Sequence, residues 1–362
     1  MHSEGADNLT LLGGGTIDGN GEGWWKCGCE GGDPAEAPCL GHDRPRLVNL
    51  VHGTGLVIRD LTFTNSPMWT LRPSWFDDVY ITNVSVLAPI SDPNTRGCNT
   101  DGIGVCVRAR SVCVCVDARA VRRCVCVCVC VVRVACFRRP RLRPEHARDR
   151  LVRAERDMHS PCDKCVSPCA RRYVSVGDDA IAVKSGLDWF GRTYGRPSRN
   201  ITFRGLRVGT GHGISIGSEM LGGVSDVLFE NILCNGTEAG PRIKSMRGRG
   251  GYVRNVTYRN ITVAGAKDAI LLTEYYGAAP PANATGTPLF DNVTYEGLRV
   301  LGASDRRGAT TFDGLPESVI TGVVLRDVDL GDAAVPFGVC NYTQGVCVGS
   351  VLPSCPPCLT PS

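Results

Sequence analysis

A short pattern that recurs along most of the chain restricts the fold more than any other feature of the sequence. It reads apolar, any residue, apolar or aromatic, any residue, then Asn, Asp or Gly, followed by apolar, any residue and apolar. The seven copies begin at Val57, Val79, Ile201, Val227, Val256, Val293 and Val323. Each copy alternates in the manner of a half-buried strand, and its central Asn, Asp or Gly indicates a bend.

Strand units of this length cannot bury their apolar face alone, so they must stack on their neighbours. The leucine-rich repeat is the main competing architecture, but its Leu-x-x-Leu-x-Leu signature is absent. We therefore predict an all-β fold, a right-handed parallel β-helix (solenoid), in which equivalent residues of successive coils form rows. An elongated polymer could lie along such a row.

Residues 105–172 interrupt this pattern with an irregular Cys/Arg-rich insert. They hold 17 Lys/Arg and 6 Asp/Glu, a charge of +11, whereas the rest of the chain carries −7. They also hold 11 of the 20 cysteines, many in Val-Cys alternation, and residues 105–176 contain no Gly, Asn, Thr or Ile. A (GT)n dinucleotide repeat encodes such alternation, so we interpret the insert as a retained intron or mis-called exon.

Two other interpretations of the insert remain, a Cys-rich metal loop and a basic arm that binds anions. Zinc sites favour Cys-x-x-Cys spacing, which occurs at Cys162 and Cys165, but Cys-x-Cys dominates. The predicted organisation is thus N-terminal coils (1–104), the anomalous insert (105–172), coils with the main catalytic motifs (173–340) and a Cys-rich C-terminal tail (341–362).

Several features bear on the compartment of the protein. Cys340, Cys347, Cys355 and Cys358 indicate a disulfide-stapled end, which favours an oxidising environment. Nine Asn-x-Ser/Thr sequons point the same way, unless the repeat itself requires this triplet. No apolar run reaches the roughly 18 residues of a membrane span. We expect a secreted, extracellular or cell-wall glycoprotein, although the N-terminus has no signal-peptide pattern and suggests a truncated gene model.

Four short motifs carry polar groups that could converge on one site. They are Asn99-Thr-Asp101, Gly177-Asp178-Asp179, Gly211-His212-Gly213 and Arg242-Ile-Lys244. Neighbouring carboxylates shift each other's pKa values, so one could act as an acid and another could activate water. The alternating Arg242 and Lys244 point to one face and suit an anionic ligand.

Each motif also has a simpler interpretation when it is taken alone. An Asp-Asp pair is usually a solvated turn or a calcium ligand, and a histidine between glycines can be a packed core residue. Two alternating cations can belong to an ordinary solvated edge. Their joint occurrence at successive repeats favours a common site.

With these four motifs in this order, the chain resembles glycoside hydrolase family 28, the polygalacturonases. The Gly-rich segment at 13–21 with Trp24-Trp25 looks like the N-terminal coil of the family, and Asn65-Ser-Pro-Met-Trp69 and the segment 217–223 are similar to its plant-type branch. It covers roughly residues 11–104 and 173–358.

The resemblance implies a hydrolase that cleaves α-1,4-galacturonosyl linkages in pectin with inversion, and it implies a role for each site residue. Asp178 would be the general acid, while Asp101 and Asp179 would hold and deprotonate the attacking water. His212 would tune the acid. The implied substrate-binding residues are Arg242, Lys244, Tyr276 and Asn99.

We expect no metal and no other cofactor. The expected partner is an acidic polysaccharide, pectin or polygalacturonate, with no nucleic acid and no membrane, and the protein should be a monomer.

Two other functions compete with this one. The insert lengthens the separation of Asp101 and Asp178 to 77 residues, where the family has about one coil, so the chain could be a non-catalytic pectin-binding β-helix. A pectate lyase shares the fold but uses calcium and an Arg base, and the complete aspartate and histidine set argues against it. The sequence does not separate exo from endo action, or galacturonan from rhamnogalacturonan as the substrate.

Overall fold

A computed structural model of the 362-residue chain describes most of the sequence outside the central insert. The described residues are 1–29, 39, 41–88, 97–106, 108–115 (backbone only), 173–277, 286–302, 310–331, 333 and 336–362. They belong to one compact unit, Met1–Val116 with Arg171–Ser362. The predicted insert lies outside the described residues except for its first part, 105–106 and 108–115.

The described residues form strands almost throughout, with two short helices, α1 (Glu22–Gly28) and α3 (Asp188–Tyr194). The strands up to the insert are β1 (His2–Glu4), β2 (Thr10–Leu12), β3 (Thr16–Asp18), β4 (Val48–Arg59), β5 (Thr62–Thr64), β6 (Leu71–Thr82), β7 (Ser85–Leu87), β8 (Ile103–Val105) and β9 (Arg108–Cys115). Those that follow it are β10 (Tyr173–Ser175), β11 (Ile181–Val183), β12 (Ser198–Arg204), β13 (Arg207–Val208), β14 (Ile214–Gly217), β15 (Val224–Asn235), β16 (Pro241–Lys244) and β17 (Tyr252–Ala264). The C-terminal coils contribute β18 (Ile270–Thr273), β19 (Leu289–Glu296), β20 (Arg299–Leu301), β21 (Thr310–Asp313), β22 (Ile320–Asp329), β23 (Cys340–Asn341), β24 (Thr343–Leu352) and β25 (Thr360–Pro361).

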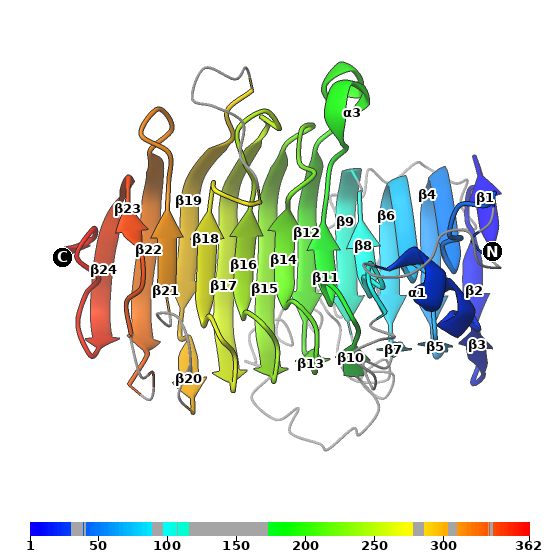
Figure 1. Ribbon diagram of the computed structural model, residues 1–362, viewed down its shortest axis with the longest axis horizontal. Coiled ribbons are helices and arrows are strands. Elements are labelled where there is room, and N and C mark those ends of the chain that lie inside the picture. Colours follow the sequence, from blue (N-terminus) through cyan, green and yellow to red (C-terminus); the bar gives the residue numbers. More distant parts are fainter. Residues whose placement is uncertain are drawn as a thin grey trace, which may run out of the picture. The chain divides into compact units, whose positions relative to one another are not determined.

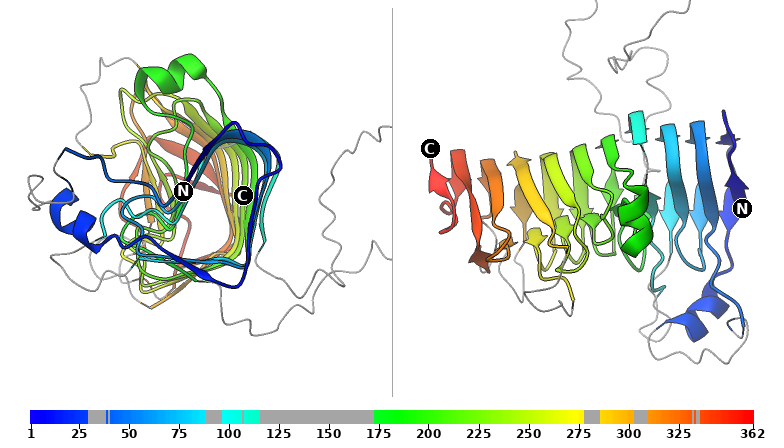
Figure 2. Two further views of the ribbon diagram at one scale, coloured as in Figure 1. Left: turned by 90° about the vertical axis from the view of Figure 1, so that its right-hand side faces the viewer. Right: turned by 90° about the horizontal axis from the view of Figure 1, so that it is seen from above.

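All pairings between these named strands are parallel, and they arrange the strands in three rows along the stack (Figure 1). The first row runs β4-β6-β8-β11-β14-β16-β18-β21-β23. The second row contains β9, β12, β15, β17, β19 and β22, and the third contains β7, β10, β13 and β20. Viewed along the stack, the coils superpose around a common interior, with α1 and α3 outside it (Figure 2). The predicted parallel β-helix is confirmed.

The central Asn, Asp or Gly of the repeat has a common backbone conformation. In all seven copies this residue has a positive φ between 50° and 68°, at Asp60, Asn83, Gly205, Asn231, Asn260, Gly297 and Asp327. This left-handed region is costly for most side chains but is accessible to Gly, Asn and Asp. The repeat therefore encodes the bend that turns each coil from the second row into the third.

The asparagine side chains at such bends bond to the preceding coil. Asn83 Nδ2 donates to Asp60 Oδ1 at 2.7 Å, and Asn260 Nδ2 donates to Asn231 Oδ1 at 2.6 Å. At a second bend, Asn292 donates to Asn255 at 2.9 Å. The amide nitrogen of these sequons is thus already engaged. The recurrence of the triplet at these bends therefore has a structural cause, and glycosylation stays a prediction.

The apolar positions of the repeat form the interior. Phe203, Phe229, Tyr258 and Tyr295 stack face to face on successive coils, with ring centroids 4.7–5.3 Å apart. All four are fully buried. Since each ring comes from the third position of its repeat, parallel pairing alone brings the rings into contact.

The first residues of the predicted insert form part of the stack. Strand β9 pairs with β6 and β12, with Val112 beside Val79 and Ile201. The bounds of the predicted insert, 105–172, stay a prediction, although its first strand pairs with both neighbouring coils. The physical reason is that Val-Cys alternation has the two-residue period of a half-buried strand, so this backbone can pair where a natural coil would.

Disulfides close both ends of the stack. The predicted C-terminal staple is confirmed as Cys340–Cys358 and Cys347–Cys355. Near the N-terminus, Cys27 pairs with Cys39 and Cys29 pairs with Cys98. Four bridges are consistent with an extracellular protein.

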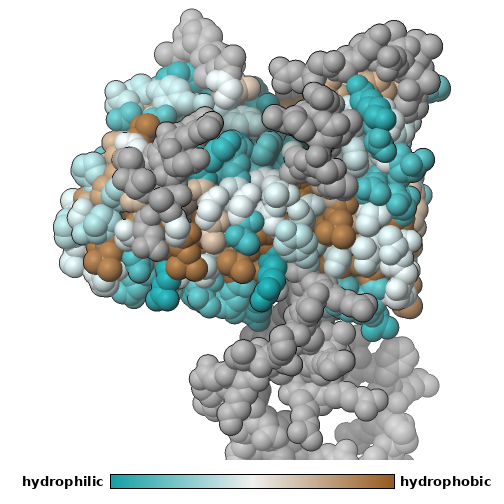
Figure 3. Space-filling model, turned by 60° about the horizontal axis from the view of Figure 1, so that its bottom comes forward, coloured by the Kyte–Doolittle hydropathy of each residue, from teal (hydrophilic) through white to brown (hydrophobic). Residues whose placement is uncertain are grey.

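Apolar residues on the face seen in Figure 3 occur as separate small groups among polar ones. Within the described part of the chain, no helix is long and apolar enough to cross a membrane. The expectations of a monomer and of no membrane partner stay predictions.

The bend at Asn260 provides a test of the repeat. Asn260→Ala should lower the free energy of unfolding by about 1–2 kcal/mol, because Ala has no easy access to φ 51°. Asn260→Gly should cost less, since Gly accepts this conformation and loses only the side-chain bond. Chemical denaturation followed by far-ultraviolet circular dichroism measures both. Equal losses for the two variants would mean that the hydrogen bond, and not the backbone, matters at this position.

Candidate active site

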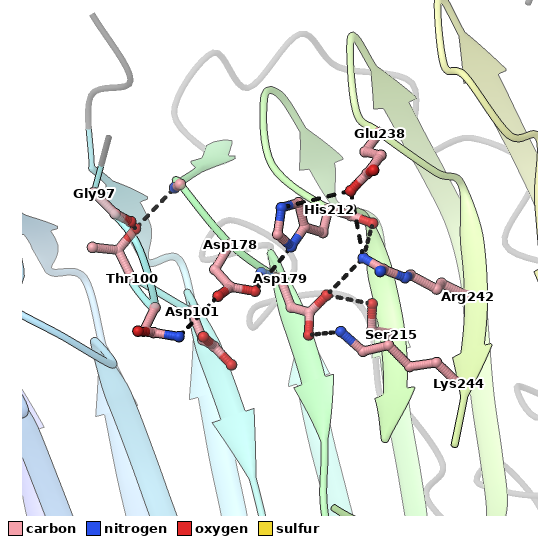
Figure 4. Close-up of polar contacts among 12 residues, drawn as sticks. Gly97, Thr100, Asp101, Asp178, Asp179, His212, Ser215, Glu238, Arg242 and Lys244 are labelled. Atoms are coloured by element: carbon pink, nitrogen blue, oxygen red, sulfur yellow. Dashed lines mark hydrogen bonds and ion pairs between the residues drawn. The ribbon is translucent and has the colours of Figure 1, made fainter. Parts of the chain in front are cut away.

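The four motifs lie at the start of consecutive strands of the first row. Ile103 of β8 pairs with Ile181 of β11, which pairs with Ile214 of β14, which pairs with Pro241 of β16. The motif residues just before or within these strands therefore lie side by side on one face (Figure 4). Alternation along β16 buries Ile243 and directs Arg242 and Lys244 outward, whereas the aspartates and His212 lie just before their strands.

Asp179 is the most enclosed of the three aspartates, with 1% of its surface exposed. Ser215 Oγ donates to its Oδ1 at 2.7 Å, and Lys244 Nζ donates to its Oδ2 at 2.8 Å. Arg242 Nη1 lies 3.6 Å from Oδ1. Two cations from β16 thus compensate the charge of this carboxylate and hold it in place.

Asp178 is the more accessible neighbour, with 19% of its side chain exposed. Its Oδ1 lies 3.0 Å from His212 Nδ1 and accepts the Asp179 backbone N–H at 2.8 Å, while Asn99 Nδ2 donates to Oδ2 at 3.4 Å. Burial would raise the pKa of Asp178, but the hydrogen bond and charge of His212, with Lys244 and the backbone donor, lower it well below its usual range. In the same way, Asp178 raises the pKa of His212 against the opposing effect of burial.

Asp101 has the opposite electrostatic character. It is 2% exposed, and burial raises its pKa to about 7 despite Lys184 Nζ at 3.5 Å, with Asp178 and Asp179 adding to the rise. Below neutral pH, the free site therefore carries its proton on Asp101 and not on Asp178. This differs from what a resting general acid at Asp178 would require.

The segment that carries Asp101 is anchored by contacts from the N-terminal region. The Cys29–Cys98 bridge ties it to the end of α1, and Arg44 donates to Cys98 O at 3.0 Å and to Asn99 Oδ1 at 2.6 Å. Thr100 Oγ1 accepts the Gly177 backbone N–H at 2.8 Å. These contacts link the segment to the coil that carries Asp178.

The remaining predicted residues complete the same face. Tyr276 lies beside the two cations of β16, with its ring centroid 5.6 Å from Arg242 Cζ and 4.9 Å from Lys244 Nζ. The structure thus brings together all eight residues singled out from the sequence. They are Asn99, Asp101, Asp178, Asp179, His212, Arg242, Lys244 and Tyr276.

Three further residues join this network and were not singled out from the sequence. Lys184 forms ion pairs with Asp101 and with Glu219 at 2.9 Å, Ser215 bonds to Asp179, and Glu238 lies 3.6 Å from His212 Nε2. Period-2 alternation could have identified Lys184 and Ser215, because each follows a buried strand residue on an outward position. Glu238 precedes β16 and carries no comparable signal.

The donor set does not fit a divalent metal, although Asp178, Asp179 and His212 offer ligand atoms within 4.8 Å of one another. Asp179 already accepts Ser215 and Lys244, and the nearby Arg242 and Lys244 would repel a further cation. A cationic ligand would therefore have to displace two positive charges.

The raised pKa of Asp101 predicts a pH dependence of stability. A carboxyl that binds its proton more tightly in the folded state contributes stability that is lost as pH rises from about 4 towards 7, by an amount on the order of a few kcal/mol. Asp101→Asn should remove this loss, so the variant should gain stability relative to the natural chain as pH rises through this window. Denaturation midpoints of both proteins across the window measure the difference. A difference that does not change with pH would contradict the assignment of the proton to Asp101.

Comparison with known proteins agrees with this arrangement. Over 354 residues, 96% of this chain, the sequence is 29% identical to a probable polygalacturonase of Vitis vinifera, and it is 26% identical over 355 residues to a polygalacturonase of Cryptomeria japonica. The chain spans only 57% and 54% of the length of these two relatives.

Solved structures share the fold. An exopolygalacturonase from Thermotoga maritima has a TM-score of 0.62 at 19% identity, covering 96% of this chain and 67% of the other. An endo-xylogalacturonan hydrolase from Aspergillus tubingensis has a TM-score of 0.60 at 15% identity, covering 97% and 76%. The model of glycosyl hydrolases family 28 matches residues 1–123 and 168–348. The chain, which carries the motifs in order on consecutive coils, therefore belongs to glycoside hydrolase family 28.

Proposed function

We propose that this protein is a polygalacturonase-like enzyme that hydrolyses α-1,4-galacturonosyl linkages in pectin with inversion of configuration. The observation that carries the proposal is the convergence of three carboxylates with Arg242 and Lys244 on consecutive coils of the first row. Paired carboxylates suit acid and base roles in glycoside hydrolysis, and two cations suit the uronate carboxylate. The relatives' names and the family agree with this chemistry.

In this mechanism Asp178 protonates the glycosidic oxygen, and it is the most accessible of the three carboxylates. Its pKa is low in the free site because His212 and Lys244 stabilise the anion. A bound uronate brings a negative charge and excludes water, and both effects raise the pKa of a carboxyl. Substrate binding therefore favours the protonated form of Asp178 at the moment when a proton donor is needed.

Asp101 and Asp179 hold and deprotonate the attacking water. The raised pKa of Asp101, about 7, makes its ionised form a stronger base than an ordinary carboxylate. Lys244 and Arg242 fix Asp179, and the same two residues with Tyr276 contact the substrate uronate. Asn99 contacts both Asp178 and the substrate.

A second candidate function is binding of pectin without hydrolysis. The observation that favours it is the long segment between Asp101 and Asp178, which replaces most of a natural coil. A displacement of about 1 Å in a catalytic group can cost on the order of 10²-fold in rate.

For both candidate functions, the proposed setting of the protein is the cell wall or another extracellular site.

In a version of the protein without the insert, Asp178→Asn should lower the rate of polygalacturonate hydrolysis by about 10²–10⁴-fold, because it removes general acid assistance. Reducing-end assays with product anomers followed by nuclear magnetic resonance measure rate and stereochemistry. The matched control is Asp291→Asn, an exposed carboxylate of β19 in the second row, which should leave the rate unchanged. Chelation of calcium should also have no effect. Unsaturated, calcium-dependent products would instead identify a lyase.

The insert allows a separate test. The chain as written should have little or no hydrolytic activity, whereas replacing about 105–172 with a coil of ordinary length should restore it. Sequencing the transcript across this region shows whether the natural protein contains the insert. Full activity of the 362-residue chain, with the insert verified by mass spectrometry, would contradict the prediction.

A further inference from the structure

A second group of cations lies on the other side of the aspartates from Arg242 and Lys244. Arg46, Arg72 and Lys184 all approach the ring of Trp69, at 5.0, 4.6 and 5.0 Å from its centroid. Three cations around one indole are unusual, since significant cation–π contacts occur about once per 70–80 residues. The two guanidinium groups thus contact the same ring.

Strand register places this group beside the active site. Leu71 pairs with Ile103, so Arg72 occupies the position of Gly104, Ala182, Ser215 and Arg242 on the following coils. Arg72 and Arg242 are thus equivalent residues four strands apart, about 19 Å at about 4.8 Å per strand. Trp69 lies two residues before Leu71, just as Asp101 lies two residues before Ile103, so the two residues occupy equivalent positions on neighbouring coils. The Thr70 backbone N–H donates to Asp101 O at 2.9 Å and joins these two segments.

The cations differ in how far their charge is compensated. Lys184 is paired with Asp101 and Glu219. Neither Arg46 nor Arg72 forms an ion pair with a carboxylate in the described part of the chain, and there the buried Nε of Arg46 makes no hydrogen bond. Burial and the charge of Arg46 lower the pKa of Arg72 to about 10, against the attraction of Cys106, Glu219 and Asp101. Asp43 attracts the charge of Arg46 but forms no ion pair with it among the described residues. Two guanidinium groups beside one ring, neither of them in such an ion pair, favour an anionic ligand.

Among the described residues, the backbone beside Arg72 is little covered. A Cβ added at Gly104, the residue next to Arg72 on the following coil, would meet only Leu71 O of these residues, at 3.8 Å. A ligand held by Arg72 could therefore approach the strand between Arg72 and the aspartates without displacing a side chain.

We propose that Arg46 and Arg72, oriented by Trp69, form a second subsite that binds the carboxylate of an acidic sugar on the opposite side of the aspartates from Arg242 and Lys244. The inference rests on the proposed function, in that the ligand is a polyuronate. Each end of the bound segment is then held by a pair of cations, with the reacting bond between them. The site accordingly selects polyuronate segments with an unesterified carboxylate at each of the two subsites. Methyl esterification of the sugar at either subsite weakens binding.

Binding to the full-length chain tests this without requiring turnover. Titration calorimetry would compare a galacturonate oligomer, its methyl ester and a neutral oligosaccharide of equal length. Arg72→Gln should weaken binding of the acidic oligomer about tenfold or more, the effect of losing one charged hydrogen-bonding group. Arg72→Lys should recover part of the loss, since it keeps the charge without the planar fork.

The matched control is Arg326→Gln, an exposed arginine of β22 in the second row, which should bind the acidic oligomer like the natural chain. For the methyl ester, Arg72→Gln and the natural chain should bind equally weakly. Unchanged binding of the acidic oligomer by Arg72→Gln, or no binding of it by the natural chain, would overturn the proposal. Hydrolysis assayed in parallel on the version without the insert separates the two proposals, because absence of turnover there with intact Arg72-dependent binding contradicts only the catalytic one.

Discussion

Parallel pairing between consecutive coils is the constraint on which the rest of this structure depends. It places each residue beside its equivalent on the next coil, so a feature repeated in the sequence becomes a row in space. The stacked rings of Phe203, Phe229, Tyr258 and Tyr295 arise in this way. The same rule carries Asp101, Asp179 and Arg242 onto neighbouring strands although they are far apart in the chain.

The chemistry of the site follows from how charge is distributed along one such row. Asp179 is compensated by two cations from β16, Asp178 by His212, and Asp101 only partly by Lys184. Burial therefore affects the three carboxylates differently, and the pKa of Asp101 rises while that of Asp178 falls. Environments that separate the pKa values of neighbouring carboxyls are what acid and base roles require. In the free protein the separation favours protonated Asp101 and ionised Asp178. Under the proposed function, Asp101 must lose its proton before it acts as the base, and a bound uronate prepares Asp178 as the acid.

The insert between β9 and β10 affects two requirements of this fold differently, the pairing of consecutive coils and the precise placement of catalytic groups. The closure of a long loop costs little extra entropy, so coils on either side can still pair. Strand β9 keeps the second row continuous because its Val-Cys alternation suits any register of the correct parity. A catalytic site requires more than continuity, since its groups must be held within a fraction of an ångström.

The sequence by itself determined the fold and which residues come together at the site. The seven copies of the repeat predicted stacked parallel strands, and the central Asn, Asp or Gly of each copy predicted a bend that the positive φ values explain. The four motifs identified seven of the eight residues that converge, because each motif precedes or occupies a strand of the same row, and the family resemblance supplied Tyr276. Only the tertiary structure decided which groups contact one another at the site and how they are protonated. Examples are the contact of Lys244 with Asp179 and the raised pKa of Asp101. It also placed Lys184, Glu238 and the cations around Trp69 beside the aspartates. The reason is that a linear pattern specifies which face a residue occupies, whereas burial and charge depend on neighbours that come from other coils.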